Sequence, residues 1–420
     1  MLSQSTSFYK KLQKRYSRRI NLDLNRINKV LAKLNYPHLV LPNPINILGS
    51  DGKMSVLTSI KCLLEADKKK VTAFTSPHLY DVRHRFWLKD KYVSLSKIKS
   101  LIKIIEKTKL KLTLFELLTC VYILAAKEQK NVSYNLVESG LLFKKDSTNL
   151  WEYPRAQILT NVNFQHSEWI RPKTLSEICK QKAGYLSKQT IIYIAKQKPK
   201  TLRIIRNILK NNSSKIVYPS AWSIKKKGSK YVFRDNYNNV PIRSKYIFSR
   251  ALINNLGLAI KVALDFGVKR KTIIKTIPKI KFQGRVQYLE KGRLTKLIKK
   301  NEKLLVDGCH SETSAENLSE YLKTLKKPVY GIWGMQKNKV PEKFIQKFKN
   351  IFKKIITVTI PNEPNALDAN TLRKICLKNR YKSENASNII EAIKKCSSSQ
   401  EKIIVIFGSL YLVGDVLSKN

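Results

Sequence analysis

The segment Gly49–Ser55, Gly-Ser-Asp-Gly-Lys-Met-Ser, constrains the fold of this 420-residue chain more than any other. It follows the short apolar run Ile45–Leu48, a predicted strand, and precedes apolar residues at helical spacing. A glycine-rich turn between a strand and a helix lets backbone N–H groups surround phosphate oxygens, and the helix start adds its positive dipole end. The sequence therefore predicts a phosphate-binding loop. Its predicted nucleotide-binding residues are Gly49, Ser50, Asp51, Gly52, Lys53, Met54 and Ser55, with Lys53 reaching the terminal phosphates and the Ser55 hydroxyl ligating Mg²⁺.

The segment after the loop supports this prediction. Val71–Phe74 reads as a second strand, so strand, loop, helix and strand form one βαβ unit. The loop lies at the carboxyl end of the first strand, where open α/β sheets bind ligands. It is not a standard Walker A sequence, because only two residues separate Gly49 from Gly52. Taken alone, the loop is equally compatible with a plain turn that starts a helix.

Further segments occur in the order and spacing of one family. They are Thr75–Leu79 (TSPHL), Leu112–Glu116 (LTLFE), Glu138–Leu141 (ESGL), Asp146–Asn149 (DSTN), His166 with Trp169, Lys182–Gly184 (KAG), Gly284–Gln287 (GRVQ), Asp307–His310 (DGCH) and Gly408–Gly414 (GSLYLVG). Together with the loop, which is similar to G-T-N-G-K-G-S, they resemble the motifs of the folylpolyglutamate synthase/dihydrofolate synthase family, relatives of the Mur ligases. The resemblance implies an α/β fold: a Mur-ligase-like P-loop ATPase domain with a central, mostly parallel sheet, and a smaller Rossmann-like C-terminal domain.

The resemblance also implies a reaction. Such an enzyme is an ATP-dependent amide ligase that adds L-glutamate to dihydropteroate, to reduced folates such as tetrahydrofolate, or to both, through an acyl phosphate. Phosphoryl transfer to a carboxylate needs charge neutralisation and alignment, which Lys53 would supply. Ser55 and Glu138 would bind one metal ion and His166 a second. Hydroxyl, carboxylate and imidazole donors suit Mg²⁺ or Mn²⁺, and a monovalent cation such as K⁺ is a further candidate.

Other site residues follow from the resemblance alone. In related enzymes the lysine that matches Lys182 is carbamylated and supports the metal site. Asn255 would lie beside the adenine, and Arg285, Asp307 and His310 would contact the phosphates and ribose of the nucleotide. The residues expected near the folate substrate are Ser76, Pro77, His78, Phe115 and Glu116.

Several positions depart from the family pattern. Met54 replaces the last glycine of the loop, and Leu142-Phe143-Lys144 replaces G-G-R. Gln165 replaces the aspartate before the metal-binding histidine, and Gln181 replaces the glutamate before the special lysine. The residues expected to touch ATP and metal nevertheless match, which favours a divergent active enzyme over a folate- or nucleotide-binding relative without turnover.

Composition points to a different class of protein. With 82 Lys and Arg against 29 Asp and Glu, the formal charge of +53 is typical of nucleic-acid binding. The lysines are spread over almost every segment, including the predicted helical runs Lys99–Lys111 and Lys261–Lys281. This spread favours A/T-biased codon usage, so no specific nucleic acid is expected, although a basic nucleic-acid-binding protein on this scaffold stays an alternative.

Length and apolar content indicate two domains, 1–287 for ATP and folate and 288–420 for the C-terminal domain. The six cysteines include no C-x-x-C pair, so neither a disulfide framework nor a zinc site is indicated. No apolar stretch approaches the roughly 20 residues of a membrane span. We therefore expect a cytoplasmic monomer that does not bind membranes.

The second domain shows a clean alternation of elements. Predicted strands and helices are Leu304–Asp307, Ala315–Leu325, Val329–Trp333, Phe344–Phe352, Ile355–Ile360 and Ile403–Phe407, and Lys225–Arg243 in the first domain reads as a β-hairpin region. Such alternation predicts a small parallel sheet with crossover helices.

Overall fold

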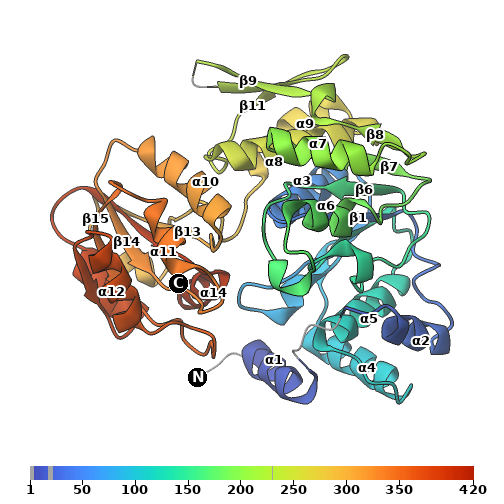
Figure 1. Cartoon of the computed structure of the whole chain (residues 1–420), viewed down its shortest axis with the longest axis horizontal. Coiled ribbons are helices and arrows are strands. Elements are labelled where there is room, and N and C mark those ends of the chain that lie inside the picture. The colour runs from blue at the N-terminus through green and yellow to red at the C-terminus, as the bar shows by residue number, and fades with distance from the viewer. Residues whose placement is uncertain (1–3, 18–21, 229) are drawn as a thin grey trace. The chain divides into compact units, whose positions relative to one another are not determined.

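The computed structural model describes residues 4–17, 22–228 and 230–420, which form two compact α/β units (Figure 1). The first unit extends to Ser244 and includes Leu252–Ile280, whereas Lys245–Ala251 and Lys281–Asn420 form the second. This corrects the predicted boundary after residue 287. The ring of Phe248 packs against Tyr288 and Tyr321, at centroid distances of 5.5 and 5.8 Å, and so ties its segment to the second unit.

An eight-stranded sheet forms the centre of the first unit, in the order β4-β3-β2-β5-β1-β6-β7-β8. Its strands are β1 (Pro44–Leu48), β2 (Val71–Phe74), β3 (Phe86–Leu88), β4 (Lys91–Tyr92), β5 (Tyr134–Glu138), β6 (Ala156–Leu159), β7 (Ile191–Ile194) and β8 (Lys215–Val217). Neighbours pair in parallel except at the edge, where β3 and β4 are antiparallel. The predicted central, mostly parallel sheet is confirmed.

Helices cover this sheet. They are α1 (Gln4–Arg15), α2 (Asn25–Lys33), α3 (Lys53–Ala66), α4 (Leu95–Glu106), α5 (Leu114–Lys127), α6 (Leu175–Ala183), α7 (Pro199–Ile208), α8 (Arg250–Asp265) and α9 (Arg270–Thr276). Phe74 and Val137 belong to an apolar core built with α2, α4 and α5, while Leu48 and Leu159 belong to a second core built with α6 and α7. The sheet is thereby buried, as a parallel sheet requires.

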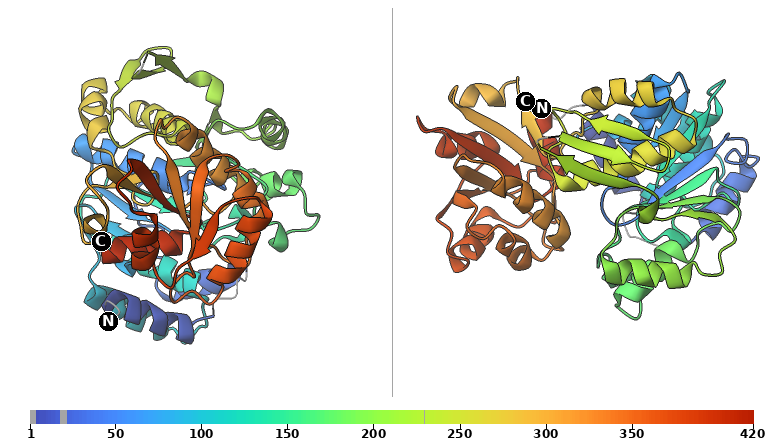
Figure 2. Two further views of the ribbon diagram at one scale, coloured as in Figure 1. Left: turned by 90° about the vertical axis from the view of Figure 1, so that its left-hand side faces the viewer. Right: turned by 90° about the horizontal axis from the view of Figure 1, so that it is seen from above.

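A separate three-stranded antiparallel sheet, β9 (Ser223–Lys227), β10 (Lys230–Arg234) and β11 (Asn239–Ile242), packs against α8 and α9 (Figure 2). The predicted hairpin therefore has a third strand. A Cβ atom on Gly257 of α8 would lie 2.5 Å from Ile224 Cδ1, so only glycine lets β9 approach the helix this closely. The predicted helical run 261–281 is wrong, because Gly267 at φ 80° separates α8 from α9.

The second unit contains one six-stranded sheet in the order β12-β13-β17-β14-β15-β16, parallel except for β12. Its strands are β12 (Gln287–Leu289), β13 (Glu302–Asp307), β14 (Val329–Trp333), β15 (Phe352–Thr357), β16 (Ser383–Asn385) and β17 (Lys402–Phe407), and its helices are α10 (Glu312–Lys323), α11 (Pro341–Gln346), α12 (Ala369–Lys378), α13 (Ile389–Cys396) and α14 (Leu410–Lys419). The predicted alternation is confirmed.

One predicted helix of this unit, Phe344–Phe352, ends too late. The helix α11 ends at Gln346, and Phe352 already begins β15. The rings of Phe348 and Phe352 both pack on Phe407, at centroid distances of 5.0 and 4.9 Å. Phe344, Phe348 and Phe352 are four residues apart, as on one face of a helix. In the structure they belong to a helix, a turn and a strand that share one core.

No helix in the described part of the chain is long and apolar enough to cross a membrane.

Candidate functional site

Four parallel strands of the first unit end at one edge of the sheet, and the predicted site residues follow those ends. The loop 49–55 follows β1, Ser76 follows β2, Glu138 ends β5, and the segment 160–166 follows β6. The register places Ile47 of β1 beside Glu138 and beside Ile158. The parallel sheet therefore gathers segments that lie more than 100 residues apart in the sequence.

The loop has the backbone of a phosphate-binding turn. Gly49 and Gly52 have φ values of 137° and 92°, a region that favours glycine. A Cβ atom on Gly49 would lie 2.1 Å from Thr160 Oγ1, and one on Gly52 would lie 2.8 Å from Asn255 Nδ2. Gly52 is also the N-cap of α3 and offers no side-chain acceptor to the first N–H groups of that helix. Such a helix start can receive an anion.

Two polar side chains of the loop, Lys53 and Ser55, donate to its own backbone. Lys53 Nζ donates to the carbonyl oxygens of Gly49 and Ser50, both at 3.2 Å. Ser55 Oγ donates to Gly52 O at 2.9 Å and accepts from Asn255 Nδ2 at 2.8 Å. Asn255 therefore lies against the loop serine, and its predicted position beside the adenine stays a prediction.

Lys182 lies fully buried behind this loop. Its Nζ donates to Gly49 O at 3.1 Å and to Leu141 O at 2.8 Å, so it joins the loop to the segment after β5. Burial, and then the positive charge of Lys53, lower the pKa of Lys182 to about 7. A large fraction of this amine is consequently neutral at pH 7.

The departures near Lys182 have structural explanations. Leu142 and Phe143 are buried and pack in the core that contains Cys179 of α6, so they fill space that glycines would leave empty. Gln181 Nε2 donates to Glu177 Oε1 at 2.6 Å, one turn earlier on the same helix. The two hydrogen bonds of Lys182 go to the backbone oxygens of Gly49 and Leu141 and use none of these side chains.

The predicted metal ligands are the Ser55 hydroxyl in the first turn of α3, the Glu138 carboxylate at the end of β5 and the His166 imidazole after β6. Glu138 is buried, and its Oε2 accepts the backbone N–H of Ser76 at 3.1 Å. His166 has φ 62° and begins a short 3₁₀ turn, with its Nδ1 3.9 Å from Glu168 Oε1. Within residues 4–17, 22–228 and 230–420, no three His, Cys, Asp or Glu side chains gather as a metal-binding group. The donor chemistry fits Mg²⁺, which commonly takes one or two protein oxygens and completes its shell with phosphate and water.

Hydrogen bonds also join the loop to the segment after β6. The sequence did not predict these contacts. Ser50 N and Asp51 N donate to Asn161 O at 2.8 and 3.2 Å. Ser50 Oγ donates to Asn163 O at 3.2 Å and accepts from Asn163 N at 3.0 Å. Asp51 Oδ2 accepts from Asn163 Nδ2 at 2.6 Å and from Gln165 Nε2 at 3.0 Å.

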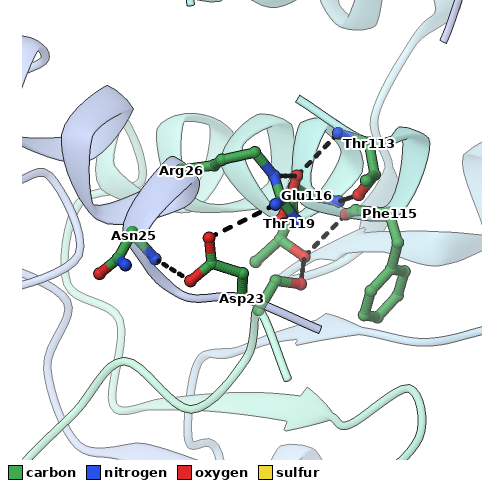
Figure 3. A network of polar contacts seen from close by, with 8 residues as sticks. Asp23, Asn25, Arg26, Thr113, Phe115, Glu116 and Thr119 are labelled. Atoms are coloured by element: carbon green, nitrogen blue, oxygen red, sulfur yellow. Dashed lines mark hydrogen bonds and ion pairs between the residues drawn. The ribbon is translucent and has the colours of Figure 1, made fainter. Parts of the chain in front are cut away.

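Glu116, predicted to contact substrate, uses both carboxylate oxygens in hydrogen bonds within the protein (Figure 3). Its Oε1 accepts from Arg26 Nη2 at 2.6 Å, and its Oε2 accepts from Thr113 N at 2.7 Å and from Arg26 Nε at 3.2 Å. Thr113 Oγ1 in turn accepts from Glu116 N, which completes a capping box at the start of α5. The Thr-x-x-Glu spacing could have indicated this role, and a contact with substrate stays a prediction.

Two other predicted substrate residues, His78 and Phe115, make contacts within the first unit. His78 Nδ1 accepts from Arg85 Nε at 2.9 Å, and the edge of its ring meets Tyr9 at 4.4 Å. Burial, and then Arg85, hold the pKa of His78 well below its usual value, so the ring is neutral at pH 7. Phe115 packs beneath Gly140, where a Cβ atom would lie 2.8 Å from its ring.

The second unit brings together Arg285, Asp307 and His310. Asp307 Oδ2 accepts from Val286 N and its Oδ1 from Cys309 N, both at 2.8 Å. Burial raises the pKa of Asp307, while the nearby charge of Arg285 opposes this rise. His310 Nδ1 lies 2.9 Å from Gly308 O. Both carboxylate oxygens of Asp307 thus accept backbone N–H groups, one from the turn before β12 and one from the turn after β13.

Comparisons with known proteins match the chain nearly from end to end. A family model described as "Dihydrofolate synthetase, C-terminal domain" matches residues 288–419. The dihydrofolate synthetase of Saccharomyces cerevisiae is 24% identical over 434 residues, covering 95% of this chain and 97% of that protein.

Two solved structures share the fold. Mycobacterium tuberculosis folylpolyglutamate synthase complexed with ADP and AMPPCP has a TM-score of 0.85 and 19% identity, covering 99% of this chain and 98% of that one. A bifunctional folylpolyglutamate synthase/dihydrofolate synthase with Mn, AMPPNP and L-glutamate bound has a TM-score of 0.83 and 17% identity, covering 99% and 98%.

Proposed function

Because the chain belongs to the family of folylpolyglutamate synthases and dihydrofolate synthases, we propose that it is an ATP-dependent ligase that adds L-glutamate to a pteroate or folate. The observation that carries this proposal is the loop 49–55, with its two left-handed glycines, the helix start behind it, and Lys53 and Lys182 on the same carbonyl of Gly49. The names and bound nucleotides of the relatives support ATP as the phosphoryl donor.

The residues of the loop perform the part of the reaction that this chemistry needs. A carboxylate is a poor acyl donor until ATP converts it to an acyl phosphate, which the amine of glutamate then attacks with loss of phosphate. The transferred group carries negative charge on its oxygens, so catalysis is mostly alignment and charge neutralisation. Backbone N–H groups of the loop would hold the phosphates, and Lys53 would leave its two carbonyls to contact the terminal phosphate.

A divalent cation fits beside this loop. Ser55 and Glu138 would hold Mg²⁺, and His166 would hold a second ion, as the donor types allow. When bound, these ions would neutralise charge on the phosphates. Mn²⁺ is present in one related structure, and the use of K⁺ stays a prediction.

Lys182 is suited to carbamylation. A neutral amine is the form that attacks CO₂, and the pKa of about 7 keeps this form populated. The N–C bond forms as one C=O π bond of CO₂ opens and one proton leaves the nitrogen for water, so the neutral amine becomes a carbamate anion that retains one N–H donor. The chain would thereby replace a positive charge beside a metal site by a negative one.

The remaining assignments are proposals that rest on sequence matches. Arg285, Asp307 and His310 would contact the nucleotide, and Asp307 also accepts the backbone N–H groups of Val286 and Cys309. Ser76, Pro77 and His78 would contact the substrate. A monomeric state and a cytoplasmic location also stay predictions, and light scattering after size-exclusion chromatography tests the first.

A coupled assay of ADP release tests the function and identifies the acceptor. Purified protein is supplied with ATP, Mg²⁺ and L-glutamate, and with either dihydropteroate or a tetrahydrofolate. We expect ADP release that requires both glutamate and at least one of the two acceptors. Release with dihydropteroate alone identifies a dihydrofolate synthase, and release with both identifies a bifunctional enzyme. ADP release that is independent of glutamate and of either acceptor would contradict the proposal.

A further inference from the structure

One hydrogen bond accounts for two positions at which this sequence departs from the family motifs. The motif loop has asparagine where this chain has Asp51, and aspartate before the histidine where this chain has Gln165. In the structure these two residues, 114 positions apart, face each other: Gln165 Nε2 donates to Asp51 Oδ2 at 3.0 Å. The family motifs and this chain thus both have one amide and one carboxylate at these two positions. In this chain the carboxylate lies in the loop 49–55, whereas in the motifs it lies before the histidine.

We propose that Asp51 is a positioning residue whose carboxylate holds the turn that presents His166, and that residues 51 and 165 form one exchangeable pair. The proposal rests on the proposed function only in assigning His166 to the nucleotide and metal site. The contact itself is a property of the first unit, so binding of a nucleotide can test it without turnover.

The geometry explains why this turn needs to be held. His166 has φ 62°, a left-handed conformation that is unfavourable for a residue with a side chain. The residue before it is fixed on both sides, since Gln165 N donates to Asn163 O at 2.9 Å and Gln165 Nε2 donates to Asp51. Asn163 Nδ2 donates to the same carboxylate oxygen at 2.6 Å. Hydrogen bonds to a charged group are stronger than those between neutral groups.

Isosteric changes can move this charge without changing side-chain volume. Asp51→Asn removes the carboxylate, but the remaining amide oxygen can still accept from Asn163. Gln165→Glu places a second carboxylate against Asp51, and the two charges repel. In the double variant, the new amide at position 51 can donate to the new carboxylate at position 165 while it accepts from Asn163. The double variant therefore again has one carboxylate and one amide, with the amide now at position 51 and the carboxylate at position 165.

The test is a double-variant cycle with two readouts. Binding of AMPPNP with Mg²⁺ is followed by the shift in melting temperature, and ATP turnover is followed by ADP release. We expect Gln165→Glu to weaken Mg²⁺-dependent nucleotide binding about tenfold, which corresponds to about 1.4 kcal/mol. We expect Asp51→Asn to weaken it a few-fold and the double variant to bind within about threefold of wild type. Asp90→Asn, at an exposed turn, is the matched control and should bind as wild type does.

Either of two binding results would overturn the proposal. One is a double variant whose loss equals the product of the two single losses, because uncoupled residues behave in that way. The other is wild-type binding and wild-type Mg²⁺ dependence in Gln165→Glu. The proposal would also be overturned if each variant lowered the melting temperature by the same amount with and without nucleotide, because the pair would then act on stability alone. If wild type binds AMPPNP but shows no ligase turnover, the proposed function fails while the binding cycle still decides this inference.

Discussion

The two units of this protein use the carboxyl ends of their parallel strands in different ways. In the first unit, side chains join a glycine-rich turn to distant segments: Lys182 of α6 donates to Gly49 O, and Asp51 of the turn accepts from the side chains of Asn163 and Gln165. In the second unit, Asp307 uses both carboxylate oxygens on the N–H groups of Val286 and Cys309. The turn of the first unit is thus held by several side chains of separate segments, whereas the turns of the second unit are held by one carboxylate, which ends β13.

This difference predicts how the two edges respond to mutation. In the first unit the charged side chains of Lys53 and Lys182 lie at the phosphate-binding loop, so their removal should reduce turnover more than stability. Asp307 satisfies buried N–H groups, so its removal should reduce stability more than turnover. Four predictions test this contrast, in order of decreasing effect.

Lys53→Ala should lower kcat by about a hundredfold or more, because the lysine would meet charge that develops in the transition state. The melting temperature should change little, since Lys53 is partly exposed and contacts only loop carbonyls. Steady-state kinetics and thermal unfolding measure the two effects, with Lys70→Ala on an exposed position as the control. A kcat within a few-fold of wild type would show that this loop does not hold the terminal phosphate.

Lys182→Ala should also lose most activity, and added acetate should restore part of it by supplying the missing carboxylate. Bicarbonate should raise the activity of wild type but not of the variant. Lys180→Ala changes an exposed position on the same helix and should keep its activity without added acetate or bicarbonate. Full activity of Lys182→Ala without any rescue agent would eliminate the carbamate.

Burial of Lys182 should also make stability depend on pH. Its folded pKa of about 7 lies below the unfolded value near 10.5, so the folded state binds fewer protons between these values. Stability should therefore rise with pH from about 7 to 10 and be independent of this group below 7. In CO₂-free buffer, the difference in unfolding free energy between wild type and Lys182→Met should increase by at most about 1.4 kcal/mol per pH unit. A flat difference over this range would mean that Lys182 is charged in the folded protein.

Asp307→Asn should have the smallest effect on turnover, within about tenfold of wild type. The asparagine keeps one acceptor oxygen but places an amide against a backbone N–H, at a cost of about 1–3 kcal/mol of stability. Denaturant unfolding measures this cost, and Asp368→Asn, an exposed helix cap, is a control for loss of a carboxylate in the same unit. A loss of turnover comparable to Lys53→Ala, with unchanged stability, would show that Asp307 acts on the nucleotide.

The sequence predicted the features that depend on neighbouring residues. The loop, the strand before it and the helix after it follow from glycine spacing and apolar periodicity over about twenty residues. The parallel sheet of the second unit follows in the same way from alternating runs of apolar residues. Even Glu116 could have been assigned to its capping box from Thr113, three residues earlier.

Features that depend on distant contacts could not be predicted in this way. The pairing of Asp51 with Gln165 could not be predicted, because only the fold brings these two residues, 114 positions apart, within hydrogen-bonding distance. The assignment of Lys245–Ala251 to the second unit depends on where the Phe248 ring packs. Gly267 interrupts a lysine-rich helical run that periodicity alone would continue.

The most direct test of the account is the mass of the product formed from ATP, L-glutamate and the better acceptor. Wild-type protein should form a product that is heavier by one glutamyl residue, with one ADP released for each product molecule. Lys53→Ala at the same concentration should form almost none. ADP release without a glutamylated product, or equal product from Lys53→Ala, would contradict the claim that this loop drives an ATP-dependent glutamate ligation.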